Sequence, residues 1–229
     1  MVRLLEAEFA LSMGDEGLAA RRLNEALAGV AESETIPLRA SVLRRAGAVF
    51  SQIGALREAV TAQQEAARLY LETAQLDRAS SALIELAWYE IEWVGEIPPA
   101  QAARVVVESY QHMMLGAEIA ARLGRPLDSA RAFMWAGLIA ARVGRPDAGQ
   151  LLDRAQRLAL STAHYGILAE LFEQRALVSE EQGETELAAE QRRRSEVFAA
   201  AAAASAPVGL ATDGDSDDTS DSESTAQTE

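Results

Sequence analysis

The sequence predicts an all-α protein made of about five antiparallel helix–turn–helix units. Three observations support this prediction. Apolar residues recur with helical periodicity between sparse prolines and glycines, and no segment alternates with the period of two that a strand requires. Alanine, the strongest helix former, supplies 47 of the 229 residues. Glycines recur at intervals of about 40 residues, where the helical patterns end.

Ten helices are predicted in five pairs. Their ranges are 2–13 with 16–31, 37–53 with 55–75, 77–94 with 98–123, 126–143 with 147–160, and 162–182 with 185–204. Five of the six prolines stand at helix starts or turns, because the amide that proline lacks would be unpaired in a first turn. Neither glycine nor proline marks the boundary at Leu76-Asp77. Gly116 is a candidate for a kink or a break in the long helix 98–123.

A repeated turn organises these pairs. The glycines that end the first helix of each pair are Gly14, Gly54, Gly95, Gly144 and Gly183. An alanine follows each glycine after four or five residues: Ala19, Ala59, Ala100, Ala148 and Ala188. Two helices joined by a tight turn approach closely only where small side chains face each other, and glycine supplies the left-handed C-cap.

With these residues the chain resembles the tetratricopeptide repeat family, in the longer-helix form found within bacterial regulators. The best unit reads Leu43-x-x-Ala46-Gly47-x-x-Phe50, then Gly54-x-Leu56-x-x-Ala59, then Ala66. The third unit departs most, because it places Trp88 where a small residue is usual. The resemblance spans residues 1–204 and implies a right-handed α-solenoid. Its motifs specify a scaffold and no chemistry.

The composition changes after this repeat domain. The last 25 residues, 205–229, hold five Asp, two Glu and no basic side chain, and they supply half of the formal net charge of −14. We expect this acidic Ser/Asp-rich tail to be disordered. The run Arg192-Arg193-Arg194 is interpreted as a polar cap on the end of the array, and the alternative is that it pairs with the tail.

Composition also excludes several classes of function. The chain has no cysteine and only two histidines, His112 and His164, so we expect no metal site and no cofactor. No run of about 18 apolar residues occurs, and glutamates interrupt the N-terminal segment, which predicts a cytoplasmic protein without a membrane span. The strong negative charge argues against nucleic acid as a partner.

No catalytic residue is predicted. His164 follows Ser161 by three residues, but the sequence offers no third group to orient it as a hydrolytic triad requires. Carboxylate pairs such as Glu180-Glu181 are common on solvated helix faces. We therefore predict that the protein is not an enzyme, and an enzyme that uses groove carboxylates is the less favoured alternative.

One helix face carries the candidate binding residues. Glu85, Tyr89, Glu92 and Trp93 have offsets of 0, 4, 7 and 8, which place them along one side of helix 77–94. The resemblance implies that this side is concave and that partner peptides lie there. The corresponding positions that it implies in other units are Arg44, Phe133 and Glu173. Two interpretations stay open, which are a partner groove and simple packing of the aromatic rings between units.

The predicted function is non-catalytic binding of another protein or peptide in the concave groove. Glu8, Glu173 and Glu180 outnumber Arg44 and Arg45 on this face, which favours a partner segment that is basic and carries apolar anchors. The alternative is a regulatory module of a bacterial system that senses a ligand or peptide between its units.

Overall fold

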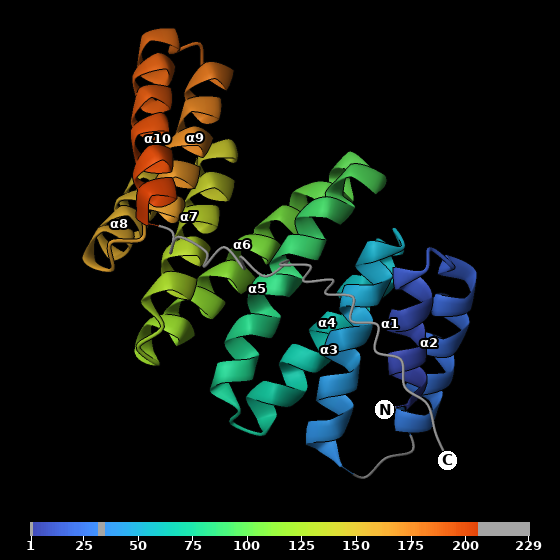
Figure 1. Ribbon diagram of the computed structural model, residues 1–229. Coiled ribbons are helices and arrows are strands. Elements are labelled where there is room, and N and C mark those ends of the chain that lie inside the picture. Colours follow the sequence, from blue (N-terminus) through green and yellow to red (C-terminus); the bar gives the residue numbers. More distant parts are fainter. Residues whose placement is uncertain (1, 32–34, 206–229) are drawn as a thin grey trace, which may run out of the picture.

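The computed structural model describes residues 2–31 and 35–205. Within these ranges the chain forms ten α-helices and one short 3₁₀ turn, and consecutive helices pack as antiparallel pairs (Figure 1). The bounds are α1 (Val2–Ser12), α2 (Glu16–Ala31), α3 (Ile36–Gln52), α4 (Leu56–Glu72), α5 (Leu76–Trp93), η1 (Val94–Glu96), α6 (Pro99–Arg122), α7 (Pro126–Arg142), α8 (Ala148–Ser161), α9 (Tyr165–Glu181) and α10 (Thr185–Ser205).

The predicted fold class and helix pairing are confirmed. Every predicted helix boundary lies within three residues of the observed one. Residues 206–229, which hold nearly all of the predicted tail, lie outside the described residues. None of the described helices is both long and apolar enough to cross a membrane.

Seven turns between these helices repeat one hydrogen-bond motif. After α3 the Ala55 N–H donates to the Phe50 carbonyl oxygen over 2.9 Å, and the Gly54 N–H donates to the Ser51 carbonyl oxygen over 3.1 Å. These two bonds form the Schellman motif, whose central residue is left-handed. The same pair of bonds closes α1, α4, α6, α7, α8 and α9.

Gly95 is not one of the left-handed residues, so this part of the predicted turn pattern is wrong. The chain leaves α5 through the 3₁₀ turn η1 and becomes extended at Ile97, before Pro98. Proline disfavours helical backbone in the residue before it, so the sequence at this turn selects a different geometry. Five other glycines have φ between 69° and 80°, and Gly124 is among them.

Two of the seven motifs place alanine at the left-handed position. Ala74 has φ 53° and Ala163 has φ 51°, in the turns after α4 and α8. A left-handed backbone costs a residue with a Cβ atom roughly 1–2 kcal/mol. The break near Leu76, which no glycine or proline marks in the sequence, is thus made by a strained alanine.

We expect Ala74→Gly to raise the free energy of unfolding by about 0.5–1 kcal/mol, because glycine adopts this conformation without strain. Urea denaturation followed by circular dichroism measures the change. Ala103→Gly, at an exposed position inside α6, is the control and should lower stability by about 1 kcal/mol. Equal destabilisation by both changes would contradict the strain assigned to Ala74.

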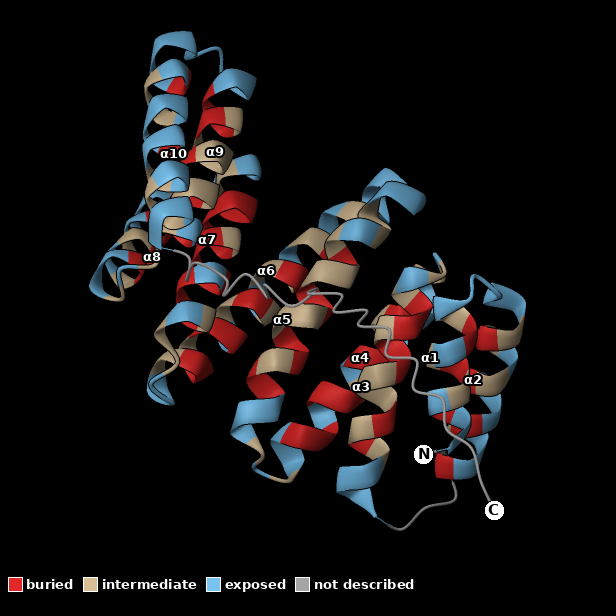
Figure 2. Cartoon of the chain, viewed as in Figure 1, coloured by how far each residue is buried: buried red, intermediate tan, exposed pale blue. Residues whose placement is uncertain are grey.

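Small residues set the spacing between paired helices. The buried residues, coloured red in Figure 2, gather where helices meet a neighbour, and many of them are alanines. A Cβ atom on Gly137 of α7 would lie 2.8 Å from Leu152 Cγ of α8. A Cβ atom on Gly116 of α6 would lie 2.8 Å from Ile84 Cγ1 and 3.1 Å from the Ser80 carbonyl oxygen, both on α5.

Gly116 therefore neither breaks nor ends α6, which runs without interruption from Pro99 to Arg122. The Ser80 hydroxyl donates to the Gly116 carbonyl oxygen over 2.8 Å and fixes the same crossing. Gly116 allows α5 and α6 to approach closely, which explains a glycine in the middle of α6.

Candidate binding groove

Three depressions join along the first helices of the first four pairs. Their volumes are about 320 Å³ between α1 and α3, about 550 Å³ between α3 and α5, and about 270 Å³ between α5 and α7. The first two share Arg45 and Ala48 in their lining, and the last two share Arg44 and Glu85. They therefore form one continuous hollow, which we call the groove.

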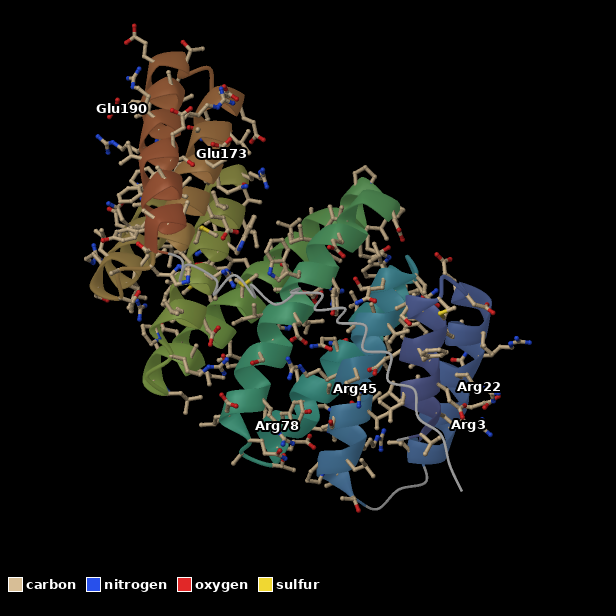
Figure 3. All side chains as sticks on the ribbon, in the orientation of Figure 1. Arg3, Arg22, Arg45, Arg78, Glu173 and Glu190 are labelled. Atoms are coloured by element: carbon tan, nitrogen blue, oxygen red, sulfur yellow. The ribbon has the colours of Figure 1, made fainter. Side chains whose placement is uncertain are left out.

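The charged lining of the groove is mainly basic. It contains five arginines, Arg44, Arg45, Arg78, Arg125 and Arg131, and three carboxylates, Glu8, Glu85 and Asp128. The chain as a whole has a formal net charge of −14, so the groove has the opposite sign to the protein that surrounds it. Figure 3 labels two of these side chains, Arg45 on α3 and Arg78 at the start of α5.

Three hydrogen-bond donors hold Glu85 at the centre of the groove. Arg44 donates from Nε to Glu85 Oε2 over 2.9 Å and from Nη2 to Glu85 Oε1, which makes a bidentate ion pair. These hydrogen bonds raise the pKa of the Arg44 guanidinium. Gln63, fully buried on α4, donates from Nε2 to Glu85 Oε2 over 2.7 Å and to the Ala82 carbonyl oxygen over 3.1 Å. The charge of Glu85 is thus compensated inside the protein.

Most of the other charged groups in the groove are also paired. Arg45 donates from Nε to Glu8 Oε1 over 2.8 Å and so links α3 to α1. Arg131 lies 3.8 Å from a carboxylate oxygen of Glu170, which is a weaker contact. These pairs link neighbouring helices, and they leave the carboxylates of the groove paired with arginines.

Arg78 differs from the other groove arginines, because it has no carboxylate partner among the described residues. It is exposed, its Nη1 donates to Gln75 Oε1 over 3.1 Å, and its guanidinium carbon lies 6.0 Å from the centroid of the Tyr70 ring. This side chain can therefore pair with an added anion without giving up an existing ion pair.

Tyr89 supplies an aromatic wall beside these charges. Burial raises the pKa of its phenol to about 12, and Glu85 and Glu92 add to the effect. The group therefore stays protonated at neutral pH and offers a ring face and a hydroxyl.

The structure brings together three of the predicted site residues, Arg44, Glu85 and Tyr89. Glu92 and Trp93 lie further along α5 and do not line the groove. Glu92 is exposed, and its Oε2 accepts a hydrogen bond from the Ser51 hydroxyl over 3.4 Å.

The prediction that Phe133 faces the groove is wrong. Its side chain is 0% exposed and packs in the core beneath Arg154, whose guanidinium carbon lies 3.9 Å from the ring centroid. Glu173 is half-buried on α9, away from the lining of the groove (Figure 3).

Sequence reasoning missed Arg78, Arg125 and Arg131. Arg78 had a usable signal, since it precedes Glu85 by seven residues and therefore shares its helix face. Arg125 lies in a turn, just before α7 begins. Its place in the groove depends on how α7 packs against α5.

Both histidines have structural contacts. The Nδ1 atom of His164 caps α9 by accepting the Ile167 N–H over 3.2 Å. The Nδ1 atom of His112 lies 2.9 Å from Oε2 of Glu90, a carboxylate that is 4% exposed and whose pKa is raised by burial. No three His, Cys, Asp or Glu side chains cluster in metal-binding geometry within the described part of the chain.

Helix pairs in series and repeated turns of one geometry give the chain a TPR-like helical repeat fold. The structure is similar to BtubC (BKLC) from P. vanneervenii, with TM-score 0.67 and 16% identity over 97% of this chain and 84% of that one. It is also similar to a putative kinesin light chain of P. anserina with TPR-like repeats, with TM-score 0.70 and 15% identity over 89% and 96% of the two chains.

A third similar structure is the apo form of RapI, with TM-score 0.54 and 17% identity over 86% of this chain and 67% of that one. At these identities the similarity establishes the fold alone. No family model and no curated protein matches the sequence.

Proposed function

We propose that the protein is a non-catalytic binding module that holds an extended segment of a partner protein in the groove. The observation that carries the proposal is the continuity of the three depressions across α1, α3, α5 and α7. An extended segment of a partner can follow such a hollow from unit to unit.

We further propose that the partner segment is acidic, whereas the sequence favoured a basic one. Glu173 and Glu180, which favour a basic partner in the sequence, do not line the groove. The charges of Glu8 and Glu85 are already paired with arginines. Partner carboxylates can instead pair with Arg78, which has no acid of its own among the described residues. The Tyr89 ring offers apolar contact beside them.

Two fluorescently labelled peptides of twelve residues test this proposal by anisotropy with the full-length protein. Both carry the same apolar residues, and the remaining positions are glutamate in one and arginine in the other. We expect tighter binding of the glutamate peptide. Arg78→Glu should weaken that binding about tenfold, mainly through slower association, and added salt should reduce the difference.

Arg57→Glu is the matched control, because Arg57 is exposed on α4, has no carboxylate partner among the described residues and does not line the groove. Arg57→Glu should leave the affinity for the glutamate peptide within about twofold of the wild-type value. Tighter binding of the arginine peptide, lost when Glu92 is changed to arginine, would overturn the acidic partner and favour the basic one. Failure of both peptides to bind would count against the groove itself.

A further inference from the structure

A fourth depression, which we call the apolar pocket, lies between the third and fourth helix pairs. Its volume is about 230 Å³, and α5, η1, α6 and α7 contribute to its walls. Nine of its ten lining residues are apolar, and the tenth is Arg142. In Figure 1, α7 and the first half of α6 diverge as a V. The lining residues Val106 and Trp135 belong to these two segments.

Trp88 explains why a hollow forms here. The sequence positions equivalent to Trp88 in the second and fourth units are Gly47 and Gly137, where an added Cβ atom would come within 2.9 Å and 2.8 Å of the partner helix. The indole of Trp88 cannot fit between two helices that are this close. It packs instead against Trp135 of α7, edge to face, with 4.2 Å between ring centroids.

The polar groups of the apolar pocket identify the charge of its occupant. Arg142 is about half-exposed, and its nearest carboxylate, that of Glu181, is 3.6 Å away. The indole Nε1–H of Trp135 is buried and has no hydrogen-bond acceptor among the described residues. Both groups are donors, so the pocket combines an apolar wall with a cation at its side and no acid in its lining.

The volume of the apolar pocket indicates the size of its occupant. An apolar cavity of about 150 Å³ stays dry and accepts benzene, so a pocket half as large again accommodates roughly nine non-hydrogen atoms. We propose that the apolar pocket is a binding site for a small organic acid, with an aromatic or branched aliphatic body in the pocket and its carboxylate on Arg142. The pocket shares one lining residue, Trp88, with the groove, whereas Trp135 and Arg142 line the pocket and not the groove. The proposal therefore rests on Trp135 and Arg142 and does not depend on the partner proposed for the groove.

Proton–nitrogen NMR spectra of the full-length protein provide the readout. The three tryptophans, Trp88, Trp93 and Trp135, give three indole N–H signals, which single Trp→Phe variants assign. Trp88 and Trp135 line the pocket and Trp93 does not. Titration with 3-phenylpropanoate should shift the signals of Trp88 and Trp135 in a saturable way and leave that of Trp93 in place.

Matched ligands and variants separate the two parts of the proposal. The alcohol 3-phenylpropan-1-ol has the same body without the charge and should bind about tenfold more weakly than the acid. Arg142→Gln should weaken binding of the acid about tenfold and leave the affinity for the alcohol within about twofold of the wild-type value. Val106→Phe, which fills the pocket, should abolish both shifts, whereas Val107→Phe, half-exposed and outside the lining, should not.

Three results of these titrations would overturn the assignment. They are no saturable shift at millimolar acid, equal affinity for acid and alcohol, and equal shifts at Trp93. An acetylated dipeptide that ends in phenylalanine carries the same phenyl group and carboxylate on a peptide backbone. Tighter binding of this dipeptide than of 3-phenylpropanoate would assign the pocket to a peptide C-terminus and so reject the free acid.

Discussion

Ala59→Glu is expected to lower the melting temperature by about 10–20 °C. Ala59 is 0% exposed and lies in α4, where α4 meets α3. A Cβ atom on Gly47 of α3 would lie only 3.3 Å from the carbonyl oxygen of Ala59, so the two backbones leave no room for a longer side chain. Burying an unpaired carboxylate in such a contact costs on the order of 5 kcal/mol, and each kcal/mol is worth about 2–4 °C at this size.

Differential scanning calorimetry or circular dichroism measures this change. Gln64→Glu adds the same carboxylate at an exposed position of α4. Its melting temperature should stay within about 1 °C of the wild-type value. Because repeat arrays unfold by neighbouring units, the damage should concentrate in the first two helix pairs. A melting temperature for Ala59→Glu like that of Gln64→Glu would mean that the helix register is misplaced.

The helices and most of the turns could be predicted from the sequence, because they depend on local signals. Glycine in a left-handed turn and apolar periodicity act over a few residues. Ala74 and Ala163 adopt the same turn without glycine, and a strained backbone of this kind persists only when the packing of the helices on both sides holds it. That information is not local, so no sequence signal marked the turn at Ala74.

The site was predictable only in part, because pairing of charges depends on how units stack. Arg44 and Glu85 are 41 residues apart, one repeat period, and equivalent positions on neighbouring first helices lie side by side. Opposite charges at equivalent positions therefore pair with each other. The sequence indicates that the two positions correspond, but not that the two side chains bind each other.

Phe133 shows that positions equivalent in sequence can differ in exposure between units. It precedes the turn glycine Gly144 by eleven residues, as Leu43 precedes Gly54, whereas Arg44 precedes Gly54 by ten. One residue rotates a helical side chain by about 100°. Phe133 therefore corresponds to the partly buried Leu43. Met134, the counterpart of Arg44, is 0% exposed as well, so the burial of this part of α7 depends on how the units stack and not on register alone.

Gly116→Leu tests the tertiary explanation of a glycine against the local one. Helix propensity alone predicts that leucine stabilises α6 by about 0.8 kcal/mol. The packing predicts the opposite sign, because the first added atom would meet Ile84 Cγ1 at 2.8 Å and the Ser80 carbonyl oxygen at 3.1 Å. A backbone oxygen cannot turn aside, so α5 and α6 must separate. We expect a loss of about 3 kcal/mol, or about 6–12 °C in melting temperature.

Gly29→Leu is the control for this change, because Gly29 is exposed within α2 and has no heavy atom within 4 Å of an added Cβ atom. Here propensity acts without a clash, so leucine should raise the free energy of unfolding by roughly 0.5–1 kcal/mol. Urea denaturation of the two variants therefore gives opposite signs for the same chemical change. If both substitutions stabilise the protein, α5 and α6 do not cross at Gly116, and the kink that the sequence suggested becomes the better explanation of that glycine.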